Sequence, residues 1–285
     1  MALAAAAGFV GGSAGWLVRA LVVDHGIQDG SADVAAGVVR RLPALGIHSA
    51  DVIRVHVADR GSPEASAREA RYAALDADAV ADDAVVLLGH TLDDQAETVL
   101  LGLARGSGTR SLAGMAAQSG RYRRPLLGVD RSVTRRACAA LGVHVWNDPH
   151  NADERFPRVR VRHQALPVLE AALGPGVAQA LARTATAARA DADALDALAA
   201  DLHTTVHGSS GLQVDGLLSA TPALRRRVLR AAALDAGCPA GDLYAQHVDA
   251  VERLLTHWHG QAGVDLPGKV RAVRSAGELR FNSSR

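Results

Sequence analysis

Short apolar runs, each followed by polar residues, recur through the first half of the chain and constrain its fold more than any other feature. Such runs cover residues 17–23 and 84–89, and the more polar segment 51–57 is predicted as a further strand between them. Each is long enough for a buried strand but too short for a buried helix. Alanine-rich segments of helical length separate them. This alternation predicts an α/β fold, a Rossmann-like parallel sheet with flanking helices.

The second half of the chain has a different pattern. An arginine-rich polar connection over 148–162 ends near Pro167 and marks a boundary. The segments after it are predicted as helices at about 175–203, 222–236 and 243–258, followed by a β-like tail from Val264 to Phe281. We therefore expect one domain over 1–165 and a smaller, mainly helical domain over 166–285.

Composition narrows the class of protein. Hydrophobic residues make up 48% of the chain and the formal net charge is +1, so a folded core is expected and the overall charge does not reveal a nucleic-acid partner. Cys138 and Cys238 stand far apart without a CxxC pair, which argues against a zinc knuckle, an iron–sulfur site or a disulfide scaffold. No apolar run suits a membrane span, so we expect the cytoplasm.

Chemically active side chains follow two of the predicted strands. Asp24 and His25 follow the first run, and His90, Asp93 and Asp94 follow the third. Because ligands bind beyond the carboxyl ends of parallel strands, these groups are expected in one crevice. The two carboxylates suit Mg²⁺ on a polyphosphate. The alternative is that they only complement a helix dipole, with His90 as a core residue.

Several blocks of residues then appear in the order found in one family of tRNA-modifying enzymes. The blocks are Leu21 to Gly26, Arg68 with Arg71 and Tyr72, His90 to Thr98, Arg105 to Gly108, Arg124 to Leu127, and Asp148 to Arg162. In these blocks the chain resembles the tRNA(Ile)-lysidine synthetases of the PP-loop ATP pyrophosphatase superfamily. The resemblance is strong over about the first 170 residues and looser beyond them.

The resemblance implies a reaction, its substrates and a set of site residues. ATP, with Mg²⁺, adenylates C2 of the wobble cytidine of a CAU-anticodon tRNA(Ile), and L-lysine displaces AMP. Relatives are often dimeric, so a homodimer is one expectation. By position, the catalytic residues are Asp24, His25, His90, Asp93, Asp94 and Glu97, with Asp93 and Asp94 as metal ligands. The nucleotide-binding residues are Asp24, His25, Arg105, Gly106 and Gly108. The tRNA-binding residues are Arg124, Arg158, Arg160, Arg162, Arg225 and Arg226.

One element of the family pattern does not occur in the sequence. The Ser-Gly-Gly-x-Asp-Ser loop, whose amides hold the pyrophosphate, is missing; the Gly11 to Gly15 segment is predicted as a helix-to-strand turn. Met1 to Ala7 fits the helix that normally follows this loop, so we expect the first strand and loop to lie upstream of Met1.

A truncated pseudoenzyme or a non-catalytic tRNA-binding protein remains the alternative. A tRNA thiolase is disfavoured by the distant cysteines, and a P-loop kinase or GTPase by the absence of GxxxxGK[ST].

Overall fold

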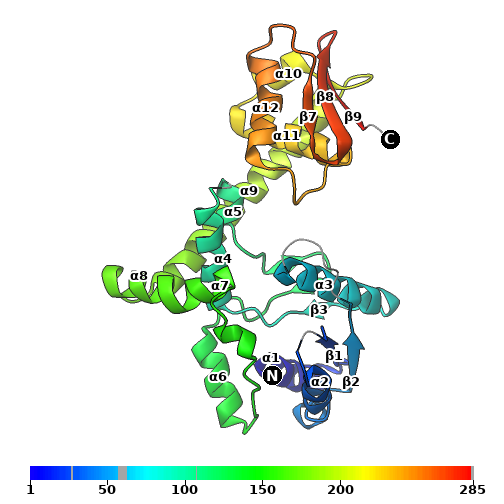
Figure 1. The fold of residues 1–285 in the computed structure, drawn as a ribbon. Coiled ribbons are helices and arrows are strands. Elements are labelled where there is room, and N and C mark those ends of the chain that lie inside the picture. The colour runs from blue at the N-terminus through cyan, green and yellow to red at the C-terminus, as the bar shows by residue number, and fades with distance from the viewer. Residues whose placement is uncertain (27, 57–62, 107, 284–285) are drawn as a thin grey trace. The chain divides into compact units, whose positions relative to one another are not determined.

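The chain folds into two compact units, which are described separately. The computed structural model describes residues 1–26, 28–56, 63–106 and 108–283. Unit 1 comprises Met1–Thr98 and Met115–Ala182, and unit 2 comprises Val99–Gly114 and Arg183–Arg285 (Figure 1). Helices α4 and α9 each have residues in both units. The domain division expected after residue 165 stays a prediction.

Unit 1 has the expected α/β character. Strand β1 (Arg19–Asp24) pairs in parallel with β2 (Ser49–Arg54), and β3 (Val86–Leu87) pairs in parallel with β5 (Tyr122–Arg123). The short strand β4 (Gln118–Ser119) is antiparallel to β5. The prediction of parallel strands is confirmed. Val57, the last residue of the second predicted strand, lies outside the described residues.

Unit 1 also contains helices, of which α2 and α3 pack against β1. They are α1 (Ala2–Ala14), α2 (Ser31–Val39), the short η1 (Pro43–Leu45), α3 (Pro63–Ala81), α4 (Leu92–Ala104), α6 (Arg131–Ala140), the short η2 (Pro149–Ala152), α7 (Pro157–Arg160), a π-helical turn (Val161–Ala165) and α8 (Leu166–Leu173). The elements expected between the first three strands therefore occur in the predicted order.

The first helix is longer than the sequence suggested. The turn predicted over Gly11 to Gly15 is wrong except at its end, because α1 continues to Ala14 and only Gly15 is left-handed, with φ 70°. Gly11 lies inside the helix, where a Cβ would come within 2.3 Å of the Val18 side chain. Glycine at position 11 therefore allows close packing against the chain that enters β1, and does not mark the turn itself.

Unit 2 combines helices with an antiparallel sheet. Its elements are α5 (Thr109–Leu112), most of α9 (Val177–Val206), β6 (Leu212–Gln213), α10 (Val214–Ser219), α11 (Pro222–Asp235), α12 (Ala245–Thr256), β7 (Val264–Leu266), the short η4 (Pro267–Lys269), β8 (Val270–Ser275) and β9 (Glu278–Ser283). The sheet has the strand order β6-β9-β8-β7, so the predicted β-like tail forms three of its strands. Leu217, Leu229, Leu254 and Leu279 are fully buried in its core.

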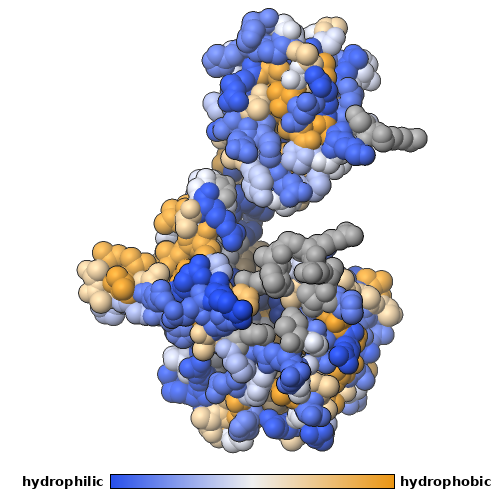
Figure 2. All heavy atoms as spheres, in the orientation of Figure 1, coloured by the Kyte–Doolittle hydropathy of each residue, from blue (hydrophilic) through white to orange (hydrophobic). Residues whose placement is uncertain are grey.

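The surface of unit 1 changes from hydrophilic over α7 to hydrophobic over α8. Figure 2 shows hydrophilic side chains over α7 and hydrophobic ones over α8, where Val168 and Leu173 are 66% and 74% exposed.

Among the described residues, no single helix is both long and apolar enough to cross a bilayer. One pair, Pro157–Leu173 with Val177–Val206, meets the length and composition criteria together but is bent by 98°.

Candidate functional site

The first strand end is organised by Asp24. Its side chain is 5% exposed, and Oδ1 accepts a hydrogen bond of 2.9 Å from the backbone N–H of Gly26, which has a left-handed φ of 61°. This bond and one from the Ser31 hydroxyl hold the pKa of Asp24 below its usual range. The carboxylate is therefore ionised and fixes the turn that presents His25.

Both predicted histidines are uncharged at neutral pH. Burial, reinforced by the charge of Arg71, lowers the pKa of His25. Burial lowers the pKa of His90 to about 4, and the charge of Arg124 contributes in the same direction. The Nδ1 atoms of His25 and His90 are buried without a hydrogen-bond partner among the described residues. Neutral imidazoles with an unused nitrogen are suited to hydrogen bonding with a ligand.

Two arginines of helix α3 carry charges that act on the strand-end histidines. The charge of Arg71 acts on His25, and the charge of Arg68 acts on His90. Residues three apart lie on the same face of a helix. The two histidines, which follow separate strands, are thus each influenced by a charge on this face of α3; that they share one crevice stays a prediction.

The acidic residues at the start of α4 connect this helix to α6. Asp94 Oδ2 accepts hydrogen bonds from the backbone N–H and the hydroxyl of Thr91 at 2.8 and 2.7 Å, and Oδ1 accepts one from Arg131 Nη2 at 2.8 Å. Asp93 Oδ2 accepts the backbone N–H of Arg131 at 2.7 Å. Burial opposes the charge of Asp94, but Thr91 and Arg131 outweigh it and lower its pKa.

Glu97 is the centre of an arginine cluster. Its side chain is 0% exposed and accepts hydrogen bonds from Arg162 Nε at 2.7 Å and from Arg131 Nη2 at 3.0 Å. Arg158 Nε lies 3.6 Å from Glu97 Oε2, and Arg158 Nη2 donates to the Thr98 hydroxyl at 2.7 Å. Glu97 is thus enclosed by cations of its own unit, and its assignment as a catalytic residue stays a prediction.

The predicted magnesium ligands are largely occupied by the protein itself. Both Asp94 oxygens and one Asp93 oxygen already accept hydrogen bonds. The described residues contain no group of three or more His, Cys, Asp or Glu side chains able to hold a metal ion. The described carboxylates therefore do not form a closed protein cage for Mg²⁺; the assignment of Asp93 and Asp94 as metal ligands stays a prediction, and we assign no step to the ion.

The remaining predicted residues lie at other points of the chain. Arg160 is exposed and donates to the backbone oxygens of Glu154 and Arg155. Arg105, Gly106 and Gly108 follow α4 in unit 2, where both glycines have left-handed φ values of 61° and 82°. Their assignment to the nucleotide stays a prediction.

In α11 of unit 2, carboxylates neutralise the predicted tRNA-binding arginines. Arg225 is 8% exposed and contacts Glu252 at 2.8 Å. Arg226 pairs with Asp249 and with Glu252. These contacts support the structural interpretation of the arginine run, and the proposed tRNA contacts remain untested.

Two contributors to the site were not among the residues predicted from sequence. Arg131 binds both Asp94 and Glu97. In the sequence, nothing distinguishes it from the many other arginines of the chain. Tyr72 belongs to a block quoted for the family resemblance, and its hydroxyl accepts hydrogen bonds from Arg68 and Arg124 at 3.2 and 3.3 Å. Spacing along the chain gives no indication of either contact.

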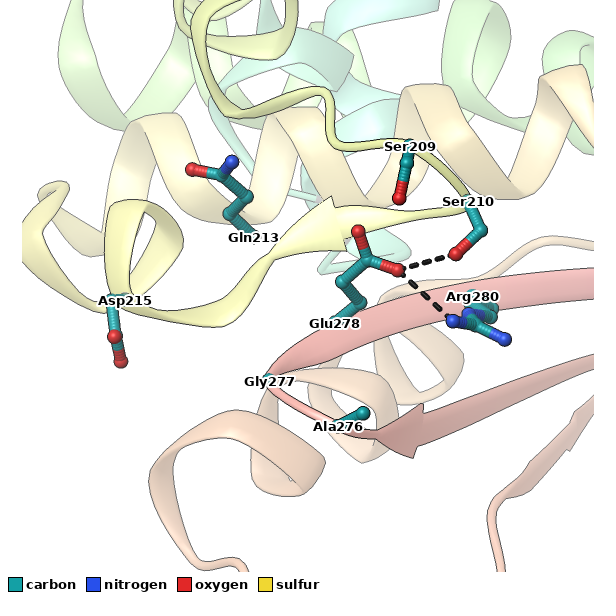
Figure 3. A pocket seen from close by; sticks show the side chains of 8 residues that line it. All are labelled: Ser209, Ser210, Gln213, Asp215, Ala276, Gly277, Glu278 and Arg280. Carbon is teal, nitrogen blue, oxygen red and sulfur yellow. Dashed lines mark hydrogen bonds and ion pairs between the residues drawn. The ribbon is translucent and has the colours of Figure 1, made fainter.

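Unit 2 contains a polar pocket of about 480 Å³ between β6 and the β8–β9 turn (Figure 3). Glu278 in its wall accepts hydrogen bonds from the Ser210 hydroxyl at 2.6 Å and from Arg280 Nη2 at 3.1 Å. Of the described residues predicted for the site, none lines this pocket. It therefore adds nothing to the chemistry of the strand ends.

Comparisons with known proteins agree with this architecture. Residues 1–169 match the model of the PP-loop domain family, and residues 212–280 match the TilS substrate binding domain. A solved structure, the U34-tRNA thiolase NcsA from Methanococcus maripaludis with its [4Fe-4S] cluster, is similar with a TM-score of 0.51 over 64% of this chain and 67% of that one. At 17% identity, this likeness concerns the fold alone.

Curated relatives are similar over almost the whole chain. The chain is 54% identical to the tRNA(Ile)-lysidine synthase of Streptomyces coelicolor over 98% of its own length and 81% of the relative. It is 53% identical to the tRNA(Ile)-lysidine synthase of Thermobifida fusca over 98% of its own length and 87% of the relative. Similarity of this extent and level shows that the chain belongs to the tRNA(Ile)-lysidine synthase family.

Proposed function

We propose that this chain ligates L-lysine to C2 of the wobble cytidine in a CAU-anticodon tRNA(Ile), with ATP as the activating substrate. The observation that carries the proposal is identity of more than half the residues to tRNA(Ile)-lysidine synthases across both units. The match of residues 1–169 to the PP-loop domain supports ATP as the nucleotide. A cytoplasmic location and a homodimer belong to the same proposal.

The proposed reaction proceeds in two displacements. The O2 oxygen of the cytidine attacks the α-phosphorus of ATP, and pyrophosphate departs. The ε-amino nitrogen of lysine, after losing a proton, then attacks C2, and the C2–oxygen bond breaks to release AMP. Adenylation is needed because it converts a poor leaving oxygen into a good one. Both steps move negative charge onto phosphate oxygens, which preorganised cations stabilise.

The described side chains supply matching groups. The cations are Arg124, Arg158 and Arg162, whose planar guanidinium groups suit phosphate oxygens. His25 and His90 offer neutral ring nitrogens, because burial lowers the pKa of each. In this proposal Asp24 orients His25, while Glu97, enclosed by arginines, positions those cations and does not contact the substrate.

Incorporation of labelled L-lysine into purified CAU-anticodon tRNA(Ile) tests the proposal. We expect ATP-dependent incorporation, none into a methionine tRNA with the same anticodon, and strong loss in a His90→Ala variant that still folds. Binding of tRNA(Ile) without incorporation would reject the enzyme and favour the alternative, a non-catalytic tRNA-binding protein.

A further inference from the structure

A group of two tyrosines and two arginines lies beside the candidate site, and of its four residues only Arg124 has a role in the proposed reaction so far. The Tyr72 and Tyr122 rings have centroids 5.0 Å apart, and the Arg68 guanidinium lies 4.7 Å from the centroid of the Tyr72 ring. Tyr72 and Arg68 are on α3, and Tyr122 is on β5. The contact between the two tyrosine rings therefore links α3 to β5.

The Tyr72 hydroxyl connects the two arginines of this group. Its oxygen accepts hydrogen bonds from Arg68 Nη2 at 3.2 Å and from Arg124 Nη2 at 3.3 Å. Arg124 is 8% exposed, and its Nη1 donates to the Ala116 carbonyl at 2.8 Å. One tyrosine oxygen thus holds two guanidinium groups that would otherwise repel each other.

Two buried nitrogen atoms, one of this group and one of the neighbouring His90, have no hydrogen-bond partner in the described part of the chain. Arg124 Nε is buried and has no hydrogen-bond partner among the described residues, and the same holds for His90 Nδ1. A buried polar atom without a partner costs free energy, so each such atom needs an explanation. No carboxylate among the described residues lies within ion-pair distance of Arg68, which is exposed.

Strand register places these groups near one another. In the parallel pair β3–β5, Leu87 is opposite Arg123, and the Leu88 N–H donates to the Arg123 carbonyl at 2.8 Å. Arg124, the next residue after this pair, therefore lies beside the segment that runs from Leu88 to His90. The charges of Arg124 and Arg68 also both act on His90, which agrees with this proximity.

We propose that Tyr72 is a positioning residue that holds Arg68 and Arg124 beside His90, and that these groups form a subsite for one phosphate group of a substrate. Two guanidinium groups and a ring nitrogen with spare capacity match the charge and acceptor atoms of a phosphate. The inference builds on the proposed function, in which the phosphate comes either from ATP or from the tRNA backbone.

The test compares two conservative variants of the same stack. Tyr72→Phe keeps the ring but removes the oxygen that holds the arginines. Tyr122→Phe is the matched control, because its hydroxyl donates to Asp76 Oδ1 at 2.6 Å and contacts neither arginine. Dissociation constants are measured for ATP and for tRNA(Ile) with the full chain, and the tRNA constant is measured at several salt concentrations.

We expect Tyr72→Phe to weaken binding of one substrate by about 3- to 10-fold, with Tyr122→Phe close to wild type. If the phosphate belongs to ATP, only ATP binding weakens. If it belongs to tRNA, tRNA binding weakens and Arg68→Gln lowers its salt slope by about one. Combining Tyr72→Phe with Arg68→Gln adds little further loss, because both changes disable the same contact.

Three outcomes overturn the inference: unchanged binding of both substrates by Tyr72→Phe, equal weakening by Tyr122→Phe, or no binding of either substrate by the wild-type chain. The proposed function is tested separately by lysine incorporation. If the binding pattern appears without incorporation, the phosphate subsite stands and the proposed reaction fails.

Discussion

At the scale of single residues, Glu97 shows how the site is held together. A fully buried carboxylate accepts hydrogen bonds from Arg131 and Arg162 and lies 3.6 Å from Arg158. Each guanidinium group also contacts a second residue of α4: Arg131 and Arg162 contact Asp94, and Arg158 contacts Thr98. The negative charge of Glu97 thus keeps three like charges close together near the strand ends.

Replacing Glu97 with glutamine should destabilise the protein by roughly 3 kcal/mol, because three partly buried guanidinium groups lose the fully buried carboxylate that they share. Urea unfolding at neutral pH measures the effect. Asp82→Asn is the control, because Asp82 forms an exposed pair with Arg19 at 3.1 Å, and such pairs contribute about 0–1 kcal/mol. Equal losses in the two variants would show that Glu97 is not the centre of the cluster.

The buried, neutral state of His90 predicts a defined pH dependence. Its pKa in the folded chain is about 4, below the ordinary 6.5, because burial and the charges of Arg124, Arg68 and Arg158 outweigh the opposing effect of Asp94. The unfolded chain therefore binds more protons between these values. The stability contributed by neutral His90 is complete above pH 6.5 and is lost as the pH falls toward 4.

NMR titration of the His90 ring measures this pKa directly, and urea unfolding at pH 7 and pH 5 measures its consequence. We expect a midpoint near 4, and a smaller loss of stability on acidification in His90→Gln than in wild type. A midpoint near 6.5 would mean that His90 is exposed to solvent and carries charge in the working range.

Sequence predicted the strand-end residues of the site better than their partners. Asp24, His25 and His90 follow apolar runs, so their position at a sheet edge is readable from periodicity. The contacts of Arg131 and Tyr72 depend on how α6 and α3 pack, which no spacing along the chain encodes. The enclosed position of Glu97 was missed for the same reason.

At the scale of elements, α1 is held by close backbone contact. A Cβ on Gly8 would lie 1.9 Å from the carbonyl oxygen of Leu45 in η1, whereas a Cβ on Gly12 of the same helix would meet no atom within 4 Å. Both glycines have helical backbone, so the difference between them is a difference of packing alone.

Gly8→Ala should destabilise the protein by about 1–3 kcal/mol, since the helix must move away from η1. Gly12→Ala should stabilise it by about 0.5–1 kcal/mol, because alanine is the better helix former at an exposed position. Thermal unfolding of the two variants checks the prediction. Two effects of the same sign would mean that α1 does not pack on η1 as described.

The element order was largely predictable, but the strand pairing was not. Apolar runs and alanine-rich segments predicted β1, β2 and the helices between them. Within the run over 84–89, only Val86 and Leu87 pair as β3. Their partner strand β5 also has two residues, and the length of a partner cannot be predicted from the run itself. The hairpin of β4 and β5 was missed since its paired residues, such as Gln118 and Arg123, do not have β-branched side chains.

At the scale of the whole molecule, a formal net charge of +1 conceals how the arginines are used. In α11, Arg225, Arg226 and Arg227 pair with carboxylates of unit 2, and three further arginines surround Glu97 in unit 1. Arg68 and Arg160 have no such carboxylate among the described residues and are exposed. Charge available for a polyanionic substrate is thus a local property of the surface, which composition does not reveal.

The central claim is that nucleotide activation and attack by an amine occur in one site. The most direct measurement counts AMP released and lysine transferred in the same reaction with ATP, L-lysine and CAU-anticodon tRNA(Ile). The account predicts one AMP per lysine transferred, with both products strongly reduced in His90→Ala. Release of ADP instead of AMP, or no lysine transfer by the wild-type chain, would contradict it.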